Sequence, residues 1–420
     1  MKTPAQPDLL LTLDQGRCQG CTHCLRVCPT EAIRIRKGKA RVMAHRCVHC
    51  GQCLRICPQK AWKVSGGENE EYVLPTAHWI RLDPAVYWQF GNRVNPAEVI
   101  RAFEEIGFSG VRDMSQAYER YRLRIQAYLS SPERALPTVS STCPAVVEFI
   151  RVKYPSLIEN LTPILPPAES VMEEGEDPSK TAKPKGVYVS PCLAHAEVLR
   201  FLPKENSEGD RILPIERIFN RVKAALRRPQ EPVLDSRVSG AFHRAMSWAV
   251  PGGESKALGI SPPFLALGLE RLGRVLDQVE AGLLDEVSYI EAWACPGGCL
   301  SGPFTVQDPC VAAYHLASWI QAQEKDESPP AVGMERIPLR LRKPLTSRPG
   351  LRLDENVKAA MEKLRRIDEI VKNLPGIDCG SCGSPTCLAL AEDIVQGLAE
   401  EADCLLLFRR LPGQRENRSD

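Results

Sequence analysis

The sequence predicts an α/β protein in which a large central α/β domain lies between a small α+β domain and a short helical domain. The first observation behind this prediction is a doubled cysteine block within residues 1–64. The second is a strand–cysteine–helix order that recurs three times in the middle of the chain. The third is a helical pattern followed by four cysteines near the end. With 420 residues, 43% hydrophobic and 25% charged, the composition is that of a folded protein of two or three domains.

Changes in composition set the expected domain boundaries at residues 1–64, 76–345 and 352–404. The polar, Gly-containing segment 65–75 and the Pro-rich, basic segment 325–351 are predicted to be linkers. No run of about 18 uncharged apolar residues is present, so no membrane helix is expected. An odd number of cysteines, 17, and a start without a secretory pattern indicate reduced thiols and predict a cytoplasmic protein.

The N-terminal domain contains the pattern Cys-x2-Cys-x2-Cys-x3-Cys-Pro twice, which is the bacterial ferredoxin run for 4Fe-4S clusters. In that run the fourth cysteine serves the other cluster. The predicted ligand sets are therefore Cys18, Cys21, Cys24 and Cys57 for one cluster, and Cys28, Cys47, Cys50 and Cys53 for the other. Alternating residues in 33–43 and 61–65, with a turn at Lys37-Gly38, predict the strands of a small two-hairpin fold. Zinc would leave the doubling unexplained, and His23 and His49 are not needed as ligands because eight thiolates suffice.

The C-terminal domain carries four cysteines at a different spacing, Cys379-x2-Cys382-x4-Cys387-x16-Cys404. Glycines at 380 and 383 would let the backbone approach a cluster closely. A helix is expected to begin near Thr386, with an apolar face made of Leu388, Ala391, Ile394, Val395 and Leu398. The motif resembles the small four-cysteine 4Fe-4S domain that accompanies electron-transfer and hydrogenase-related proteins, and a zinc site is the alternative.

In the central domain, three predicted strands are each followed within three residues by a cysteine, which is expected to lie near a helix start. The cysteines at these strand ends are Cys143, Cys192, Cys295 and Cys299. Ligands of α/β sheets gather at the carboxyl ends of strands, and helix N-termini favour anions and lower thiol pKa values. The four thiols are therefore expected to converge on one anionic metal cluster. The alternative is that each is a small buried hydrophobic residue.

At these residues the chain resembles the catalytic domain of iron-only (FeFe) hydrogenases, and in particular the sensory branch of that family. The family's Thr-Ser-Cys-Cys-Pro, Met-Pro-Cys-x-x-Lys-x-x-Glu and Glu-x-x-x-Cys-x-x-Gly-Cys loops correspond to residues 141–144, 190–197 and 291–299. The resemblance implies a two-lobed α/β domain whose cubane is held by the four central cysteines. It also implies that Cys299 bridges to a diiron subsite where dihydrogen is handled.

Three positions depart from the family's pattern. Thr142 stands where the family has a proton-delivering cysteine, and a Thr hydroxyl hardly ionises. His195 replaces a lysine that contacts a cyanide ligand, and Leu165-Pro166-Pro167 replaces a Ser-Pro-Met that places a Met beside the subsite. These changes argue against full hydrogenase activity and against the diiron subsite, but they leave the cubane ligands intact. His195 is expected to be either a pH-active pocket residue or a histidine of the helix surface or core.

Charge is distributed unevenly, although the net charge is only +2. Residues 1–64 contain twelve Lys or Arg and three acids, whereas residues 376–404 contain six acids and no Lys or Arg. These charges are either solvated surface, or the basic region docks an acidic redox partner or the C-terminal region itself. No recognition motif accompanies the basic excess, so a nucleic-acid role is not supported.

The sequence thus favours an electron-transfer or redox-sensing protein with four 4Fe-4S clusters, two N-terminal, one central and one C-terminal. The alternative is a genuine hydrogenase of low activity with a diiron subsite bridged by Cys299. A third hypothesis is a structural or regulatory module whose central domain holds no metal. Cys310 has no motif partner and is predicted to be a buried thiol.

Overall fold

The computed structural model describes residues 10–64, 78–91, 94–112, 114–174, 186–200, 211–228, 238, 240–323, 344–348, 353–354 and 356–410. The chain separates into two compact units. The terminal unit comprises residues 1–48, 52–67 and 347–420, and the central unit comprises residues 49–51 and 68–346. The predicted linker at 65–75 and most of that at 325–351 lie outside the described residues. The two ends of the chain therefore belong to one folded unit.

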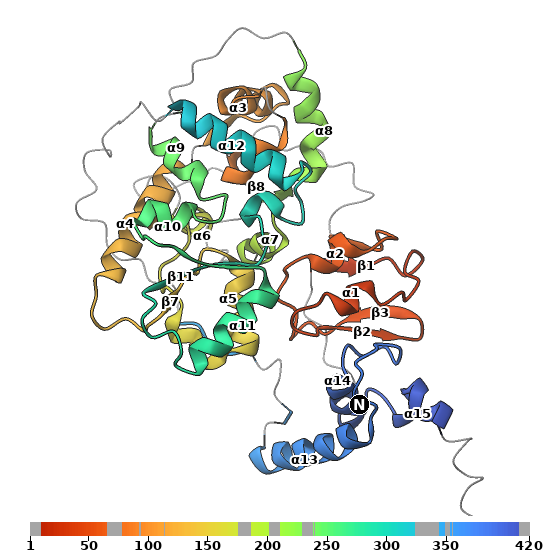
Figure 1. Ribbon diagram of the computed structural model, residues 1–420. Helices are drawn as coiled ribbons and strands as arrows, with labels where there is room; N and C mark the ends of the chain where they lie inside the picture. The colour runs from red at the N-terminus through yellow and green to blue at the C-terminus, as the bar shows by residue number, and fades with distance from the viewer. Residues whose placement is uncertain are drawn as a thin grey trace, which may run out of the picture. The chain divides into compact units, whose positions relative to one another are not determined.

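Two antiparallel strand pairs build the N-terminal part of the terminal unit (Figure 1). Strand β2 (Ile33–Arg36) pairs with β3 (Lys39–Val42), and β1 (Leu11–Leu13) pairs with β4 (Trp62–Val64). The turn between β2 and β3 has φ values of 51° at Lys37 and 69° at Gly38, which a tight two-residue hairpin needs. The strands predicted from residues 33–43 and 61–65 are confirmed.

The two cysteine blocks fold alike and are hydrogen-bonded to each other. Equivalent residues of the two blocks are as far apart in the sequence as Cys18 and Cys47. Short helices α1 (His23–Arg26) and α2 (Gln52–Ile56) occupy equivalent places in the two halves. The Asp14 N–H donates to Ala61 O at 2.8 Å, and the equivalent Met43 N–H donates to Ala32 O at 2.7 Å. Each half therefore completes the other, which explains why the sequence carries the block twice.

Helices form the C-terminal part of the terminal unit: α13 (Val357–Asn373), α14 (Cys387–Val395), the 3-10 turn η6 (Glu401–Asp403) and α15 (Leu405–Arg410). The hydroxyl of Thr386 accepts from Ala389 N at 3.0 Å and caps α14, which confirms the predicted helix start. The buried core includes Ile367, Ile370 and Leu390. The predicted apolar face of α14 is only partly right, because Leu388 is 51% exposed while its neighbours Ala389 and Leu390 are buried.

Two parallel sheets form the framework of the central unit. The larger has the order β6 (Gly110–Arg112), β5 (Trp79–Leu82), β8 (Gly186–Ser190), β9 (Arg211–Pro214). The smaller has the order β10 (Phe264–Leu267), β11 (Tyr289–Trp293), β7 (Thr138–Val139). All pairings within both sheets are parallel. This confirms the α/β class and the division of the central domain into two lobes.

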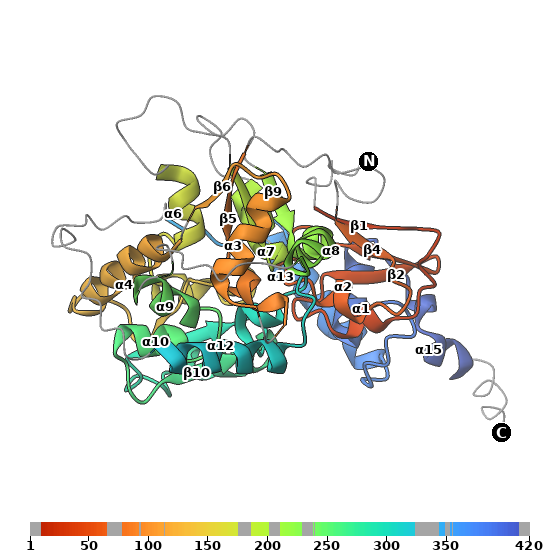
Figure 2. The same ribbon diagram turned by 90° about the horizontal axis from the view of Figure 1, so that it is seen from above.

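Helices connect and cover these strands, as Figures 1 and 2 show. Helix α7 packs on β8 and β9, and α11 packs on β10 and β11. The α-helices of the central unit are α3 (Pro96–Glu105), α4 (Ser115–Leu129), α5 (Pro144–Lys153), α6 (Pro167–Glu174), α7 (Leu193–Arg200), α8 (Ile215–Leu226), α9 (Gly240–Ser247), α10 (Gly253–Leu258), α11 (Leu269–Glu280) and α12 (Pro309–Gln323). Short 3-10 segments are η1 (Pro84–Gln89), η2 (Pro155–Asn160) and η4 (Gly298–Ser301).

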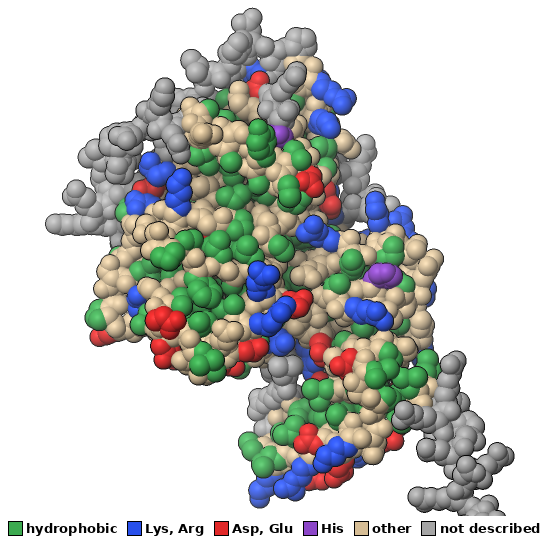
Figure 3. All heavy atoms as spheres, viewed as in Figure 1, with side chains coloured by type: hydrophobic (Ala, Val, Ile, Leu, Met, Phe, Trp, Pro, Cys, Tyr) green, Lys and Arg blue, Asp and Glu red, His purple; other side chains and the backbone are tan. Residues whose placement is uncertain are grey.

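Side chains of different character share the surface of the central unit (Figure 3). Among the described residues, no helix combines the length and the apolarity that crossing a bilayer requires. On the face of the central unit drawn in Figure 3, basic, acidic and hydrophobic side chains are interspersed, and no continuous basic strip is visible there.

The prediction that Cys310 is buried is wrong: its side chain, at the start of α12, is exposed.

Candidate metal centres

The first cysteine loop of the N-terminal part brings three thiols together around α1. Burial and, to a smaller extent, the charges of Cys18 and Cys21 raise the pKa of Cys24 to about 11. The ring Nδ1 of His23 lies 3.2 Å from Cys21 Sγ, so His23 contacts a predicted ligand without being needed as one. Burial disfavours the thiolate form, but metal coordination deprotonates a thiol. The raised pKa is therefore compatible with these thiols as ligands of a metal cluster.

The last cysteines of the two blocks lie in equivalent surroundings. Ala32 N–H donates to Cys28 Sγ at 3.2 Å, and Ala61 N–H donates to Cys57 Sγ at 3.3 Å. Backbone donors of this kind stabilise charge on cluster sulfurs and tune reduction potentials. The exchange of fourth ligands between the two clusters remains a prediction from the spacing.

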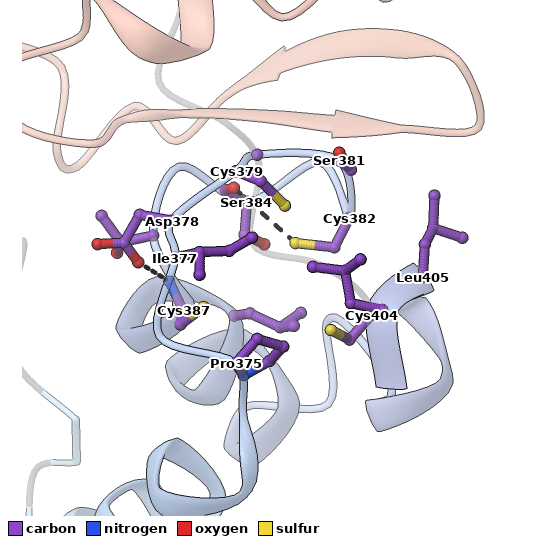
Figure 4. Close-up of a pocket in the computed structure, with 14 residues that line it drawn as sticks. Pro375, Ile377, Asp378, Cys379, Ser381, Cys382, Ser384, Cys387, Cys404 and Leu405 are labelled. Atoms are coloured by element: carbon purple, nitrogen blue, oxygen red, sulfur yellow. Dashed lines mark hydrogen bonds between the residues drawn. The ribbon is translucent and has the colours of Figure 1, made fainter. Parts of the chain in front are cut away.

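The C-terminal cysteines line one pocket, shown in Figure 4. The four are Cys379, Cys382, Cys387 and Cys404. Burial raises the pKa of Cys382, and the charges of Cys379 and Cys404 raise it further. Asp378 Oδ1 accepts from Cys387 N at 2.6 Å, which ties the loop before the first cysteine to the start of α14. The predicted ligand loop and the distant Cys404 are therefore brought together.

Each central cysteine follows a strand of one of the two sheets. Cys143 is the N-cap residue of α5 just after β7, and Cys192 lies between β8 and α7. Cys295 follows β11, and Cys299 lies within η4. Helix starts and strand ends therefore occur where the sequence predicts them.

The four central thiols lie close enough to act on one another electrostatically. Burial raises the pKa of Cys192, and the charges of Cys295 and Cys143 raise it further. Burial likewise raises the pKa of Cys299, followed by the charges of Asp83 and of the three other cysteines. Thiols that follow strands of two different sheets thus lie close together, in a region where Cys192 is buried and the other three cysteines are half-buried, and this donor set fits an anionic iron–sulfur cluster.

Family comparisons agree with this assignment along the chain. Residues 77–259 match the family "Iron only hydrogenase large subunit, C-terminal domain". Residues 10–58 match "4Fe-4S dicluster domain", and residues 374–406 match "Putative Fe-S cluster". The chain is a hydrogenase-like iron–sulfur protein. It carries 4Fe-4S domains at both ends and a hydrogenase-like domain between them.

Solved structures of FeFe-hydrogenases are distantly similar to this hydrogenase-like protein. A structure describing stepwise H-cluster assembly in HydA(deltaEFG) is 15% identical, with a TM-score of 0.39, and the match covers 60% of this chain and 86% of that chain. One on oxygen inactivation of the H cluster is 14% identical, with a TM-score of 0.41, covering 62% and 88%. A variant of apo HydA1 from Chlamydomonas reinhardtii is 14% identical, with a TM-score of 0.39, covering 60% and 86%. No curated protein matches the chain.

Thr142, the first departure from the hydrogenase pattern, belongs to a buried network of hydroxyls around a carboxylate. Its Oγ1 donates to Glu254 Oε1 at 3.0 Å and lies 3.1 Å from the hydroxyl of Tyr121. Ser140 and Tyr289 also donate to Glu254, at 2.9 and 2.5 Å. Burial and, to a smaller extent, the charge of Glu291 raise the pKa of Glu254 to about 7. A group that titrates near neutrality is therefore hydrogen-bonded to the residue beside Cys143.

His195, the second departure, is buried on α7 and faces a second buried carboxylate. Its Nδ1 lies 3.8 Å from Asp83 Oδ2, and the hydroxyl of Tyr188 donates to the same oxygen at 2.8 Å. Burial raises the pKa of Asp83, and the charge of His195 opposes this effect. His195 is therefore a buried histidine and not one of the helix surface.

Two carboxylates near the central thiols were not predicted from the sequence. Asp83 directly follows β5, so the strand-end rule that found the cysteines would also have found it. Glu254 lies in a Gly-rich segment that has no nucleotide-loop pattern, and nothing local in the sequence marks it. The carboxylate of Glu291 fixes the start of α10, which carries Glu254, because it accepts from Gly252 N at 2.7 Å and Ser255 N at 2.8 Å.

Proposed function

We propose that this hydrogenase-like protein is a cytoplasmic redox protein that relays electrons through four 4Fe-4S clusters, in electron transfer or redox sensing. Such a cluster supplies one-electron chemistry at a potential set by burial, charge and hydrogen bonds to sulfur. The observation that carries the proposal is the convergence of four buried or half-buried thiols that follow strands of two different sheets and lie close enough to influence one another's pKa values. Nothing in a purely structural domain requires these thiols to meet.

The chain's own residues would hold and tune the clusters. The two N-terminal clusters would be held by Cys18, Cys21, Cys24 and Cys57, and by Cys28, Cys47, Cys50 and Cys53. The central cluster would be held by Cys143, Cys192, Cys295 and Cys299, and the C-terminal cluster by Cys379, Cys382, Cys387 and Cys404. The amides of Ala32, Ala40 and Ala61 donate to sulfurs of the N-terminal part and would stabilise their negative charge. A redox partner protein would exchange electrons with this chain.

Iron analysis of anaerobically purified protein tests the proposal. About sixteen iron atoms per chain are expected, and Cys143→Ala should remove about four of them. Cys310→Ala is the matched control, because this exposed thiol is the only cysteine outside the four predicted ligand sets, and its loss should leave the iron content unchanged. Iron that stays constant in Cys143→Ala would support the hypothesis of a central domain without metal.

One observation favours a second candidate, a hydrogenase of low activity with a diiron subsite bridged by Cys299. The buried network from Thr142 to Glu254 places a carboxyl group of pKa about 7 beside the central thiols. Such a group can release and rebind protons at neutral pH, which the Thr hydroxyl alone cannot do. Dihydrogen oxidation with a viologen acceptor after maturation, two further irons and infrared bands of carbonyl and cyanide would establish this candidate. Their absence from fully matured protein would exclude it.

A further inference from the structure

The arginines at the edge of the ferredoxin-like part are not solvated surface. Arg34 Nε lies 2.5 Å and Arg36 Nη2 lies 2.6 Å from the same oxygen of Asp393 on α14. The side chain of Asp393 is 2% exposed and that of Arg34 is 5% exposed. The hydroxyl of Ser384 also donates to Asp393, at 2.9 Å. A solvated ion pair stabilises little, but this carboxylate is fully enclosed by its partners.

A second ion pair extends this contact toward the other cysteine block. Arg46 Nη2, next to Cys47 in sequence, lies 2.7 Å from Glu392 Oε2. The side chain of Arg46 is 4% exposed, so this pair is buried on the arginine side. Two of the six acidic residues in 376–404, Glu392 and Asp393, therefore pair with arginines of 1–64 within one folded unit. Of the alternatives raised by the charge pattern, the contacts support docking of the C-terminal region itself.

The loop that carries the C-terminal cysteines also lies directly against β2. Ile35 N–H donates to Gly383 O at 2.8 Å, and Arg36 Nη1 donates to Cys382 O at 3.4 Å. A Cβ atom on Gly383 would lie 2.0 Å from Ile35 O, so only glycine allows this approach. The backbone of residues 379–384 is therefore packed closely against the ferredoxin-like part.

The same loop reaches α1, which carries a predicted ligand of the first cluster. Arg26 Nη2 donates to Cys379 O at 3.1 Å. A Cβ atom on Gly380 would lie 3.4 Å from the Leu25 side chain, which is ordinary packing distance. Leu25 and Arg26 directly follow Cys24 in α1. Predicted ligands of the C-terminal cluster and of the first N-terminal cluster thus lie on the two sides of one packed contact.

We propose that the C-terminal domain is the built-in redox partner of the ferredoxin-like domain, and that Asp393 is the residue that positions it. The inference rests on the proposed function, because it requires clusters in both pockets. One electron would pass from a reduced cluster on one side to an oxidised cluster on the other, with no bond formed or broken. An outside acidic partner would then have to use other basic residues, such as the exposed Arg41 and Arg55.

Electron paramagnetic resonance of the dithionite-reduced full-length protein tests this proposal. Neighbouring reduced clusters broaden each other's signals, so the wild type is compared with Cys382→Ala, which should lack the C-terminal cluster. The signals of the N-terminal clusters should differ between these two proteins. Identical N-terminal signals, in a wild type that contains the full iron content, would overturn the inference but leave the proposed function standing. Iron lacking from the C-terminal pocket of the wild type would instead contradict the proposed function.

Asp393→Asn then tests the positioning role. It should retain the iron of the wild type, while its N-terminal signals become those of Cys382→Ala. Glu369→Gln is the matched control, since it removes an exposed carboxylate of the same domain and should leave the signals unchanged. Wild-type signals in Asp393→Asn would overturn the role of this residue.

Hydrogen exchange gives a readout that does not depend on the clusters. Exchange of the Ile35 amide, which donates to Gly383 O, should become about tenfold faster or more in Asp393→Asn, because the contact opens locally. If Asp393→Asn does not fold, Arg36→Gln is used, because it leaves the Arg34–Asp393 pair in place. Exchange at Ile35 that stays at the wild-type rate in these variants would refute the positioning role.

Discussion

The ends of the chain and its centre gather cysteines in different ways. In the C-terminal pocket, three of the four thiols come from residues 379–387 and only Cys404 comes from further along the chain. In the central unit, the thiols come from the ends of strands in two separate sheets. A local ligand set forms with its own loop, whereas a distributed set forms only when the whole unit is folded. Loss of one ligand should therefore have local consequences at the ends and wider ones in the centre.

The largest expected effect comes from removing one thiol in each region. Cys192→Ala and Cys382→Ala should each lose about four iron atoms. Cys192→Ala should also lower the thermal unfolding midpoint of the central unit, because metal binding contributes to folding and this cluster would join both sheets. Anaerobic calorimetry with iron analysis measures both quantities. Equal effects of the two variants on the midpoint of the central unit would contradict the distinction between local and distributed sites.

The same distinction explains how much of the molecule is predictable from the sequence. The cysteine spacing predicts the ends because their strands, turn and ligand loops are encoded within a few residues, as at Lys37-Gly38 and Thr386. In the centre, the strand-end cysteines are predictable, but the Glu254 network is not. Its carboxylate accepts from Thr142, which is 112 residues away in the chain, so no local pattern records the contact.

Two side-chain environments were mispredicted for a related reason. Cys310 is exposed because the start of α12 turns this residue outward, and the preference of free cysteines for burial does not specify the direction. Leu388 is exposed because the Ile367–Ile370–Leu390 core contacts a neighbouring stripe of α14. Periodicity predicts a helix here, but the packing partner decides which residues of it are buried.

Two buried carboxylates extend the comparison between the regions. Asp393 in the terminal unit is enclosed by two guanidinium groups, whereas Glu254 in the central unit is held by the hydroxyls of Ser140, Thr142 and Tyr289. Asp393→Asn should cost about 3–5 kcal/mol of unfolding free energy, since it leaves buried cations without their counterion. Denaturant unfolding of the anaerobic protein measures this. A cost below about 1 kcal/mol would mean that the pair behaves as an exposed one.

Glu254→Gln should instead change how stability depends on pH. Burial and the charge of Glu291 raise the pKa of Glu254 from 4.5 to about 7, so the folded protein holds this proton more tightly than the unfolded chain. The resulting stabilisation is fully present below pH 4.5 and is lost as the pH rises through 7. Relative to Glu254→Gln, the wild type should therefore lose up to ~3 kcal/mol across this window. Parallel pH profiles of the two proteins would contradict the raised pKa.

The smallest effect concerns a glycine that positions Glu254. A Cβ atom on Gly253 would lie 1.8 Å from Ser247 O at the end of α9, so Gly253→Ala must displace α10. The cost should be about 1–3 kcal/mol, as for other overpacked sites. Gly38→Ala is the matched control at the N-terminal end: it strains a positive φ of 69° but meets no atom within 4 Å. Both variants should be destabilised, but only Gly253→Ala should also alter the pH profile assigned to Glu254, because only it moves the helix that begins beside this carboxylate. An unaltered profile would show that the hydroxyls of Ser140, Thr142 and Tyr289 fix Glu254 without help from the placement of α10.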